Sequence, residues 1–178
     1  MSLKKVFLAT TLALSSSLVL ADNVSYDYVD LGYQDYDGAD GFAFELSKSF
    51  SADFYGRLDY TNLEADNSNI DIEFLRLNLG YKMPISSSTD FIAELGYEDI
   101  DVDFLGDDDG FNARLGLRGM ATRNFELGGF VSYSDVLEST DLTVEGRYHI
   151  NNQFSVALEV GNDEELDEHY GVSFRYNF

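Results

Sequence analysis

Two histidines are the first candidates for chemistry in this sequence. Hydrolysis of a lipid acyl bond needs a nucleophile, a base and an orienting group within hydrogen-bond reach. His149 lies two residues after Arg147 in an alternating segment, and His169 follows Glu168 with no serine two residues later. Neither histidine supplies the required set, so we interpret His149 as a polar residue inside a sheet and His169 as a residue at its rim. We therefore expect no enzymatic activity and no cofactor.

The acidic runs are the second candidates. The spacing Asp99-x-Asp101-x-Asp103 is similar to the start of a calcium-binding loop, which needs Gly at its sixth position and a bidentate acid at its twelfth. The sequence has Phe104 and Gly110 at those positions. The alternation therefore favours a strand face in water. A weak site for Ca²⁺ or Mg²⁺ is an alternative to loose counter-ion binding at Asp107, Asp108, Asp109, Glu164 and Glu165.

Composition excludes several classes of protein. The 178 residues include 33 Asp and Glu against 11 Lys and Arg, for a net charge of −22. Nucleic-acid binding needs a basic surface, so we expect no nucleic-acid partner. The absence of cysteine excludes disulfides, thiolate metal sites and a cysteine nucleophile. With 44% apolar and 15% aromatic residues, the chain has enough apolar surface to fold.

The first 21 residues have the features of an export signal. Lys4 and Lys5 precede an apolar stretch over residues 6–14, and Val19 and Ala21 occupy the −3 and −1 positions of a cleavage site before Asp22. All acidic residues follow this segment. These features predict a secretory signal peptide over residues 1–21 and a single domain over residues 22–178.

After residue 22 the apolar period is two, which is typical of strands. For example, Leu75, Leu77 and Leu79 alternate with Arg76 and Asn78. We count ten strands in an antiparallel, up-and-down order, or eight if the weak first hairpin pairs differently. Short connections are predicted at 51–53, 84–89, 122–124 and 151–153, and longer ones near 35–41, 64–71, 98–110, 134–141 and 162–168. An even strand count places both chain ends at the short connections.

The polar faces of these strands carry long charged side chains next to glycines, a mixture that suits a crowded interior. The charged members are Asp30, Glu45, Arg57, Asp59, Arg76, Glu94, Arg114, Arg118, Glu126, Glu145, Arg147, Glu159 and Arg175. Six arginines nearly balance seven acids, and a small barrel is barely wide enough for its own side chains. We predict a lumen plugged by Arg–carboxylate pairs. A narrow polar pore is the alternative.

The apolar faces are banded by aromatic residues. Phe lies at the short-connection ends, at Phe50, Phe54, Phe91, Phe125, Phe154 and Phe178, and Tyr lies at the opposite ends, at Tyr33, Tyr60, Tyr97, Tyr133 and Tyr170. Two aromatic girdles around an aliphatic waist favour a transmembrane β-barrel over a soluble barrel with an apolar interior.

Beyond the tyrosines the chemistry of the two faces reverses. Asp99, Asp101 and Asp103 continue the lipid-facing parity, as do Asp71 and Glu73 on a neighbouring strand. Ile100, Val102 and Phe104 continue the inner parity, together with Ile70, Ile72 and Phe74. A strand that leaves a bilayer for water is expected to show this reversal.

The last strand carries alternating residues that end on an aromatic: Tyr170, Val172, Phe174, Tyr176 and Phe178. This pattern resembles the terminal strand by which Gram-negative outer-membrane proteins are recognised for assembly, although Ser173 stands where glycine is favoured. With the leader and hairpins, the chain resembles small outer-membrane β-barrels of the OmpA/OmpX-type and porin-like group.

The resemblance implies a Gram-negative outer-membrane location with periplasmic termini. Its implied partners are outer-membrane lipid, lipopolysaccharide and the barrel-assembly machinery. The acidic residues of the loops add divalent cations as candidate partners. Its implied function is a structural or interaction role at the cell surface. A narrow channel for small solutes or ions is the second reading, and a lipid-modifying enzyme is the third.

The charge distribution gives a test of orientation. The five longer connections contain no Lys or Arg. Trypsin added to intact cells is therefore expected to leave the chain uncut, whereas a Glu/Asp-directed protease should cut within 107–109 or 164–165. Tryptic fragments ending at Lys82 or Arg123 would show the opposite orientation.

Overall fold

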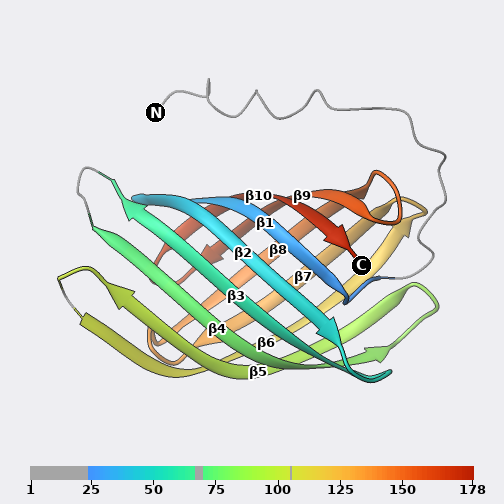
Figure 1. The fold of residues 1–178 in the computed structure, drawn as a ribbon, viewed down its shortest axis with the longest axis horizontal. Coiled ribbons are helices and arrows are strands. Elements are labelled where there is room, and N and C mark those ends of the chain that lie inside the picture. Colours follow the sequence, from blue (N-terminus) through green and yellow to red (C-terminus); the bar gives the residue numbers. More distant parts are fainter. Residues whose placement is uncertain (1–23, 67–69, 105) are drawn as a thin grey trace.

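The computed structural model describes residues 24–66, 70–104 and 106–178, which form a closed antiparallel β-barrel (Figure 1). Its strands are β1 (Tyr28–Tyr36), β2 (Ala39–Ser49), β3 (Phe54–Ala65), β4 (Asp71–Pro84), β5 (Thr89–Val102), β6 (Gly106–Thr122), β7 (Phe125–Ser134), β8 (Ser139–His149), β9 (Phe154–Asp163) and β10 (Asp167–Asn177). The predicted ten-stranded order is confirmed, and the eight-stranded alternative is wrong. The predicted signal peptide lies outside the described residues.

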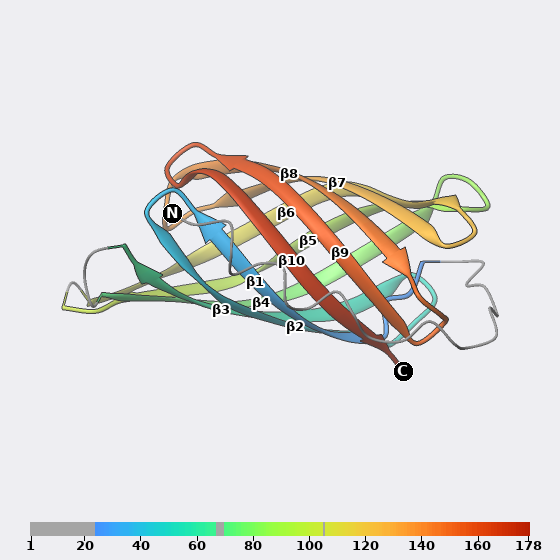
Figure 2. The same ribbon diagram turned by 90° about the horizontal axis from the view of Figure 1, so that it is seen from above.

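Closure is made by β1, which pairs with both β2 and β10. Tyr28 lies opposite Asn177 and Tyr36 lies opposite His169, so β1 begins where β10 ends. We call this the termini end. The strands run obliquely around the barrel in both ribbon views (Figures 1 and 2). Closure leaves no free sheet edge, which a backbone surrounded by hydrocarbon requires.

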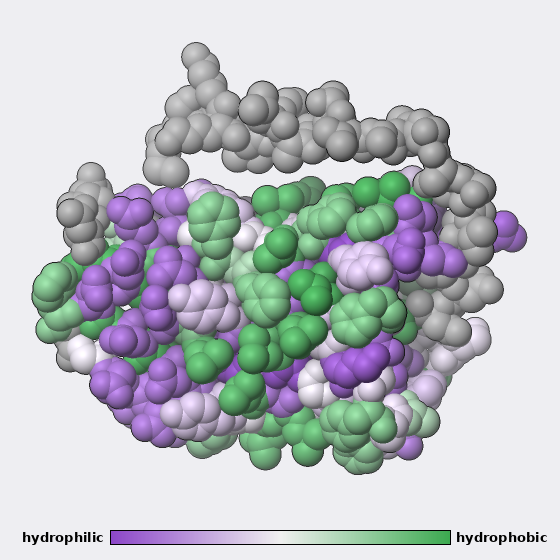
Figure 3. Space-filling model, in the orientation of Figure 1, coloured by the Kyte–Doolittle hydropathy of each residue, from purple (hydrophilic) through white to green (hydrophobic). Residues whose placement is uncertain are grey.

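The distribution of polarity is the reverse of that in a soluble protein. Leu158 is 68% exposed, whereas Arg147 is 1% exposed. Apolar residues spread over the middle of the outer surface in Figure 3. Exposed aromatic side chains flank this zone, with Phe50 and Phe178 toward the termini end and Tyr97 and Tyr170 toward the other. This banding matches the surface of a barrel that crosses a bilayer.

The end opposite the termini carries most of the acidic residues, and we call it the acidic end. Its connections are 37–38, 66–70, 103–105, 135–138 and 164–166. The long loops predicted there are wrong, because the strands continue past the tyrosines. Ile100 still pairs with Asp108, for example. Backbone ladder bonds need no apolar side chains, so the consecutive aspartates Asp107, Asp108 and Asp109 conceal the first residues of β6, which project into water.

Phe104 was predicted to continue the inner face, and this is also wrong. It lies in the turn between β5 and β6, where its φ is 67° and its side chain is 92% exposed. The turn reverses the chain at this point, so the alternation of faces along β5 no longer applies.

Inward glycines make room for rings from neighbouring strands. A Cβ atom at Gly80 would lie 2.2 Å from the ring of Tyr55, and one at Gly161 would lie 2.2 Å from the ring of His169. Gly116 leaves the same kind of space for Phe130. The glycines of the polar faces therefore determine where bulky side chains can lie inside the barrel.

Gly96 provides a test of this packing. A Cβ at Gly96 would lie 2.1 Å from the carbonyl oxygen of Leu77, whereas one at Gly129 meets no atom of the described residues within 4 Å. Gly96→Ala is expected to lower the free energy of unfolding by about 1–3 kcal/mol because backbone must shift. Gly129→Ala should be neutral or slightly stabilising. Urea unfolding in lipid vesicles measures both, and equal stabilities would contradict the packing described.

Candidate functional site

The inner wall of the barrel carries the predicted charged residues, at adjacent positions of successive strands. Asp30 lies opposite Glu45, Glu45 opposite Asp59, and Asp59 opposite Arg76. The same wall continues through Glu94 with Arg114, Glu126 with Arg147, and Glu145 with Glu159. Alternation in the sequence therefore places these side chains in one lumen.

Arg147 joins strands from both sides of the barrel closure. Its guanidinium lies 2.8 Å from Asp30 and 3.0 Å from Glu145. Arg175 on β10 contacts the same Asp30 oxygen at 2.8 Å. Each charge is buried beside an opposite charge, as a low-dielectric interior requires.

A second group lies on β6, β7 and β8. Arg118 contacts Glu126 at 2.7 Å, and Glu126 also lies 3.1 Å from Nε2 of His149. The structure places His149 inside the lumen, as the sequence indicated.

Arg57 is the centre of a third group. It contacts Glu45 at 3.0 Å, Asp59 at 2.5 Å and Glu94 at 2.7 Å. The hydroxyl of Tyr55 donates a hydrogen bond to Glu94 at 2.5 Å. One guanidinium thus holds carboxylates from β2, β3 and β5 together.

Glu98 is a lumen residue that the sequence analysis placed in a connection. It is fully buried, pairs with Arg76 at 2.8 Å and accepts a hydrogen bond from Ser134. Its alternation with Glu94 and Gly96 was the available signal, but the predicted connection was placed at 98–110 and so included this residue.

Aromatic residues complete the closure at the termini end. The Tyr26 ring lies 4.7 Å from that of Tyr55, and its hydroxyl donates to Asp90 at 3.0 Å. The carbonyl of Tyr26 accepts a 2.7 Å bond from Ser47. The segment before β1 therefore packs inside the barrel. Sequence analysis missed it because residues 24–27 precede the first alternating strand.

The layer formed by these groups is called the floor, and its residues are at most 6% exposed. It comprises Tyr26, Tyr28, Asp30, Tyr55, Arg118, Glu126, Arg147 and Arg175. The Arg175 guanidinium lies 3.5 Å from the centroid of Tyr28 and adds a cation–π contact. Rings and ion pairs together fill this end of the lumen.

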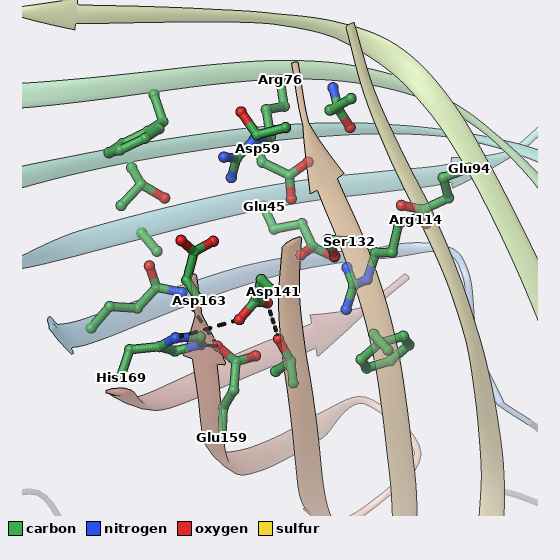
Figure 4. A pocket seen from close by; sticks show the side chains of 18 of the residues that line it. Glu45, Asp59, Arg76, Glu94, Arg114, Ser132, Asp141, Glu159, Asp163 and His169 are labelled. Carbon is green, nitrogen blue, oxygen red and sulfur yellow. Dashed lines mark hydrogen bonds and ion pairs between the residues drawn. The ribbon is translucent and has the colours of Figure 1, made fainter. Parts of the chain in front are cut away.

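Above the floor lies a cavity of about 190 Å³, which we call the chamber. Glu45, Asp59, Arg114, Ser132, Asp141, Glu159, Asp163 and His169 are among the residues that line it (Figure 4). The side chains of Arg76, Glu45 and Glu159 are 32%, 24% and 23% exposed, so the chamber is accessible to solvent.

His169 is not the rim residue that the sequence predicted. It is buried in the lumen, stacks on Tyr36 at 4.8 Å, and lies 3.7 Å from both Asp141 and Glu159. The inward parity of β10 continues past Tyr170, which brings this imidazole into the chamber. Asp163, also lining the chamber, accepts a 3.1 Å bond from Ser139.

An apolar cluster narrows the chamber toward the acidic end. Leu63, Phe74 and Ile100 form its buried part, and Leu137 and Leu166 from two turns pack against it. The reversal of the two strand faces that the sequence shows is therefore present in the structure. At the acidic end the outer faces of the strands carry acidic residues, and the inner faces carry apolar ones.

The described residues include no group of three or more acidic or histidine side chains that could hold a metal ion. Asp107, Asp108 and Asp109 lie on β6 and alternate between its faces. Glu164 and Glu165 lie in the last turn. Divalent-cation binding at these residues stays a prediction, without a converging ligand set in this part of the chain.

In the ranges that the structure describes, no helix is long and apolar enough to span a membrane.

Several solved structures are similar to this barrel, among them two porins and an outer membrane channel. The KdgM porin has 12% identity and a TM-score of 0.53, covering 85% of this chain and 99% of its own. The NanC porin has 9% identity, the same coverages and a TM-score of 0.54. The COG4313 outer membrane channel from Pseudomonas putida F1 has 9% identity and a TM-score of 0.50, covering 93% of this chain and 100% of its own.

The chain has the fold of the small outer-membrane β-barrels. No family model and no curated protein sequence matches it. At identities of this size the likeness concerns the fold, and the side chains of the lumen must be interpreted on their own.

Substitution of Arg147 tests whether the ion pairs of the floor stabilise this outer-membrane barrel fold. Arg147→Met keeps the length of the side chain but leaves Glu145 buried without its guanidinium. The free energy of unfolding is expected to fall by about 3–5 kcal/mol, less where water enters. Arg123→Met removes an exposed charge from a turn and serves as control. Urea unfolding in vesicles that left both variants at wild-type stability would contradict the role of the floor.

Proposed function

We propose that the chain is an integral outer-membrane barrel that is closed at its floor and opens at the cell surface. The main support for this proposal is the floor, where paired charges and closely packed rings leave side chains at most 6% exposed. A continuous water path would require exposed polar side chains at every level of the lumen. The proposed role is a structural or interaction function at the surface, served by the acidic end and the chamber.

The membrane location is supported by the exposed apolar band and its aromatic edges. The orientation is supported by charge. The turns of the acidic end contain no Lys or Arg, while Lys48, Lys82 and Arg123 lie near the termini end. We therefore assign the acidic end to the exterior and the termini end to the periplasm.

A narrow channel is the second candidate, favoured by the chamber and by the similar structures, which are titled as porins or a channel. A further similar structure is described as the KdgM porin in complex with disordered oligogalacturonate, which is a polyanion. Seven acidic side chains and five arginines line this chamber, so its excess of negative charge does not favour a polyanion.

Conductance in a planar bilayer distinguishes the two candidates. Wild-type protein is expected to show no sustained current. Tyr26→Ala combined with Arg147→Ala removes a ring and a guanidinium from the floor and should open a leak. The leak should favour cations, because Asp30 and Glu145 then lose a positive partner.

Arg123→Ala, which leaves the floor intact, should be as silent as wild type. Each sample is first checked for the shift in gel mobility between unheated and boiled protein that a closed barrel shows. Steady, defined current steps from the wild type would overturn the closed-barrel proposal and support the channel.

A further inference from the structure

The charges that remain after pairing in the lumen are unevenly distributed. Arg57, Arg76, Arg118, Arg147 and Arg175 each lie within 3.0 Å of a carboxylate oxygen. Arg114 forms no ion pair among the described residues, although the carboxylates of Glu45 and Asp59 lie near enough to interact with its charge. Asp141, Glu159 and Asp163 likewise contact no Lys or Arg within that part of the chain, and His169 is their only basic neighbour.

Three of these remaining charges, Arg114, Asp141 and Asp163, lie on one row of the wall. Arg114 on β6 pairs with Ser132 on β7, Ser132 pairs with Asp141 on β8, and Asp141 pairs with Asp163 on β9. Strands are spaced by roughly 4.8 Å, so the backbones at Arg114 and Asp141 are about 10 Å apart. Arg114, Ser132 and Asp141 line the same chamber (Figure 4).

Arg114 is held ready for an anion. Its guanidinium stacks over Phe130 at 3.7 Å from the ring centroid, and Phe130 occupies space left by Gly116 and Gly128. The Nε atom of Arg114 is buried without a hydrogen-bond partner among the described residues. An unsatisfied buried donor is costly, and the planar guanidinium fits two oxygens of an anion such as a carboxylate.

The other side of the chamber suits a cation. Oδ1 of Asp141 and Nδ1 of His169 are buried, and neither has a hydrogen-bond partner within the described ranges. His169 is 3% exposed and points at Asp141 and Glu159 (Figure 4). Its 3.7 Å separations are longer than hydrogen bonds, so a three-donor ammonium group can satisfy these carboxylates better than the imidazole does.

We propose that the chamber binds a small zwitterion, with its carboxylate on Arg114 and its ammonium group at Asp141 and Glu159. The volume of about 190 Å³ is below the roughly 300–1,000 Å³ typical of drug-sized ligands, so the ligand class is an amino acid of modest size. Ser132 lies between the two charged positions and offers a hydroxyl to either group. The site needs only the folded barrel, so this inference goes beyond the closed-barrel proposal and does not depend on conductance.

Binding to the purified full-length barrel in detergent micelles is measured by calorimetry. The probes are glycine, β-alanine and γ-aminobutyric acid, with acetate and methylammonium as ions of one sign. At least one zwitterion is expected to bind about tenfold more tightly than either single ion, because each charged end adds about 1.4 kcal/mol or more. The preferred length in the series reports the spacing between Arg114 and the carboxylates.

Variants separate the two ends of the site. Arg114→Gln and Asp141→Asn are each expected to weaken zwitterion binding about tenfold, and Arg114→Lys should retain part of the affinity because it keeps the charge. Arg123→Gln and Glu138→Gln, which change exposed turn residues, are the matched controls and should bind as wild type does. Heat-dependent gel mobility shows that each variant is folded.

Three results would overturn the site. They are no binding of any zwitterion at millimolar concentration, binding of acetate or methylammonium as tight as that of the zwitterions, and unchanged affinity in folded Arg114→Gln and Asp141→Asn. None of these bears on conductance, so the failure of the site and the failure of the closed-barrel proposal give different results.

Discussion

Closure of the sheet between β1 and β10 is the constraint on which the other features depend. Because every strand is paired on both sides, the backbone N–H and C=O groups are hydrogen-bonded within the sheet and need no water. The outer faces can therefore consist of apolar residues such as Leu, Val and Phe. The same closure encloses a lumen that is narrow and shared by all ten strands. Charged side chains on the inner faces must then find partners across a small space.

In the lumen, single arginines form ion pairs with several carboxylates, and aromatic rings pack against inward glycines. Arg57 holds three acids from three strands, and Tyr55, which donates to one of them, lies over Gly80. Ion pairing and aromatic packing therefore depend on each other. Gly80 leaves space for the ring of Tyr55, and in that position the Tyr55 hydroxyl reaches the carboxylate of Glu94. The segment around Tyr26 adds an element from outside the strands, and this element completes the floor.

Above the floor, some charged side chains lack an ion-pair partner of opposite sign, and this distinguishes the chamber from the rest of the lumen. Arg114 contacts a ring where the other lumen arginines contact acids, and Asp141 and Glu159 face an imidazole at 3.7 Å. Charged side chains that are all paired with one another have no free groups to bind a ligand. Unpaired charges of both signs that are held in fixed positions can bind one. The barrel therefore combines a stabilising layer with a layer suited to binding.

The sequence by itself determined the up-and-down order and the face of almost every side chain, because a period of two is a local property of each strand. It favoured ten strands over eight, and the closed sheet decided between them. It also identified the inward charges. It did not reveal that β6 begins before its three aspartates, that Glu98 and His169 lie in the lumen, or that Tyr26 fills the floor. Those facts depend on the stagger of paired strands around the closed barrel, which decides what lies opposite each residue across the lumen. Alternation fixes whether a side chain points inward, but only the closed three-dimensional sheet decides which other side chain it meets there.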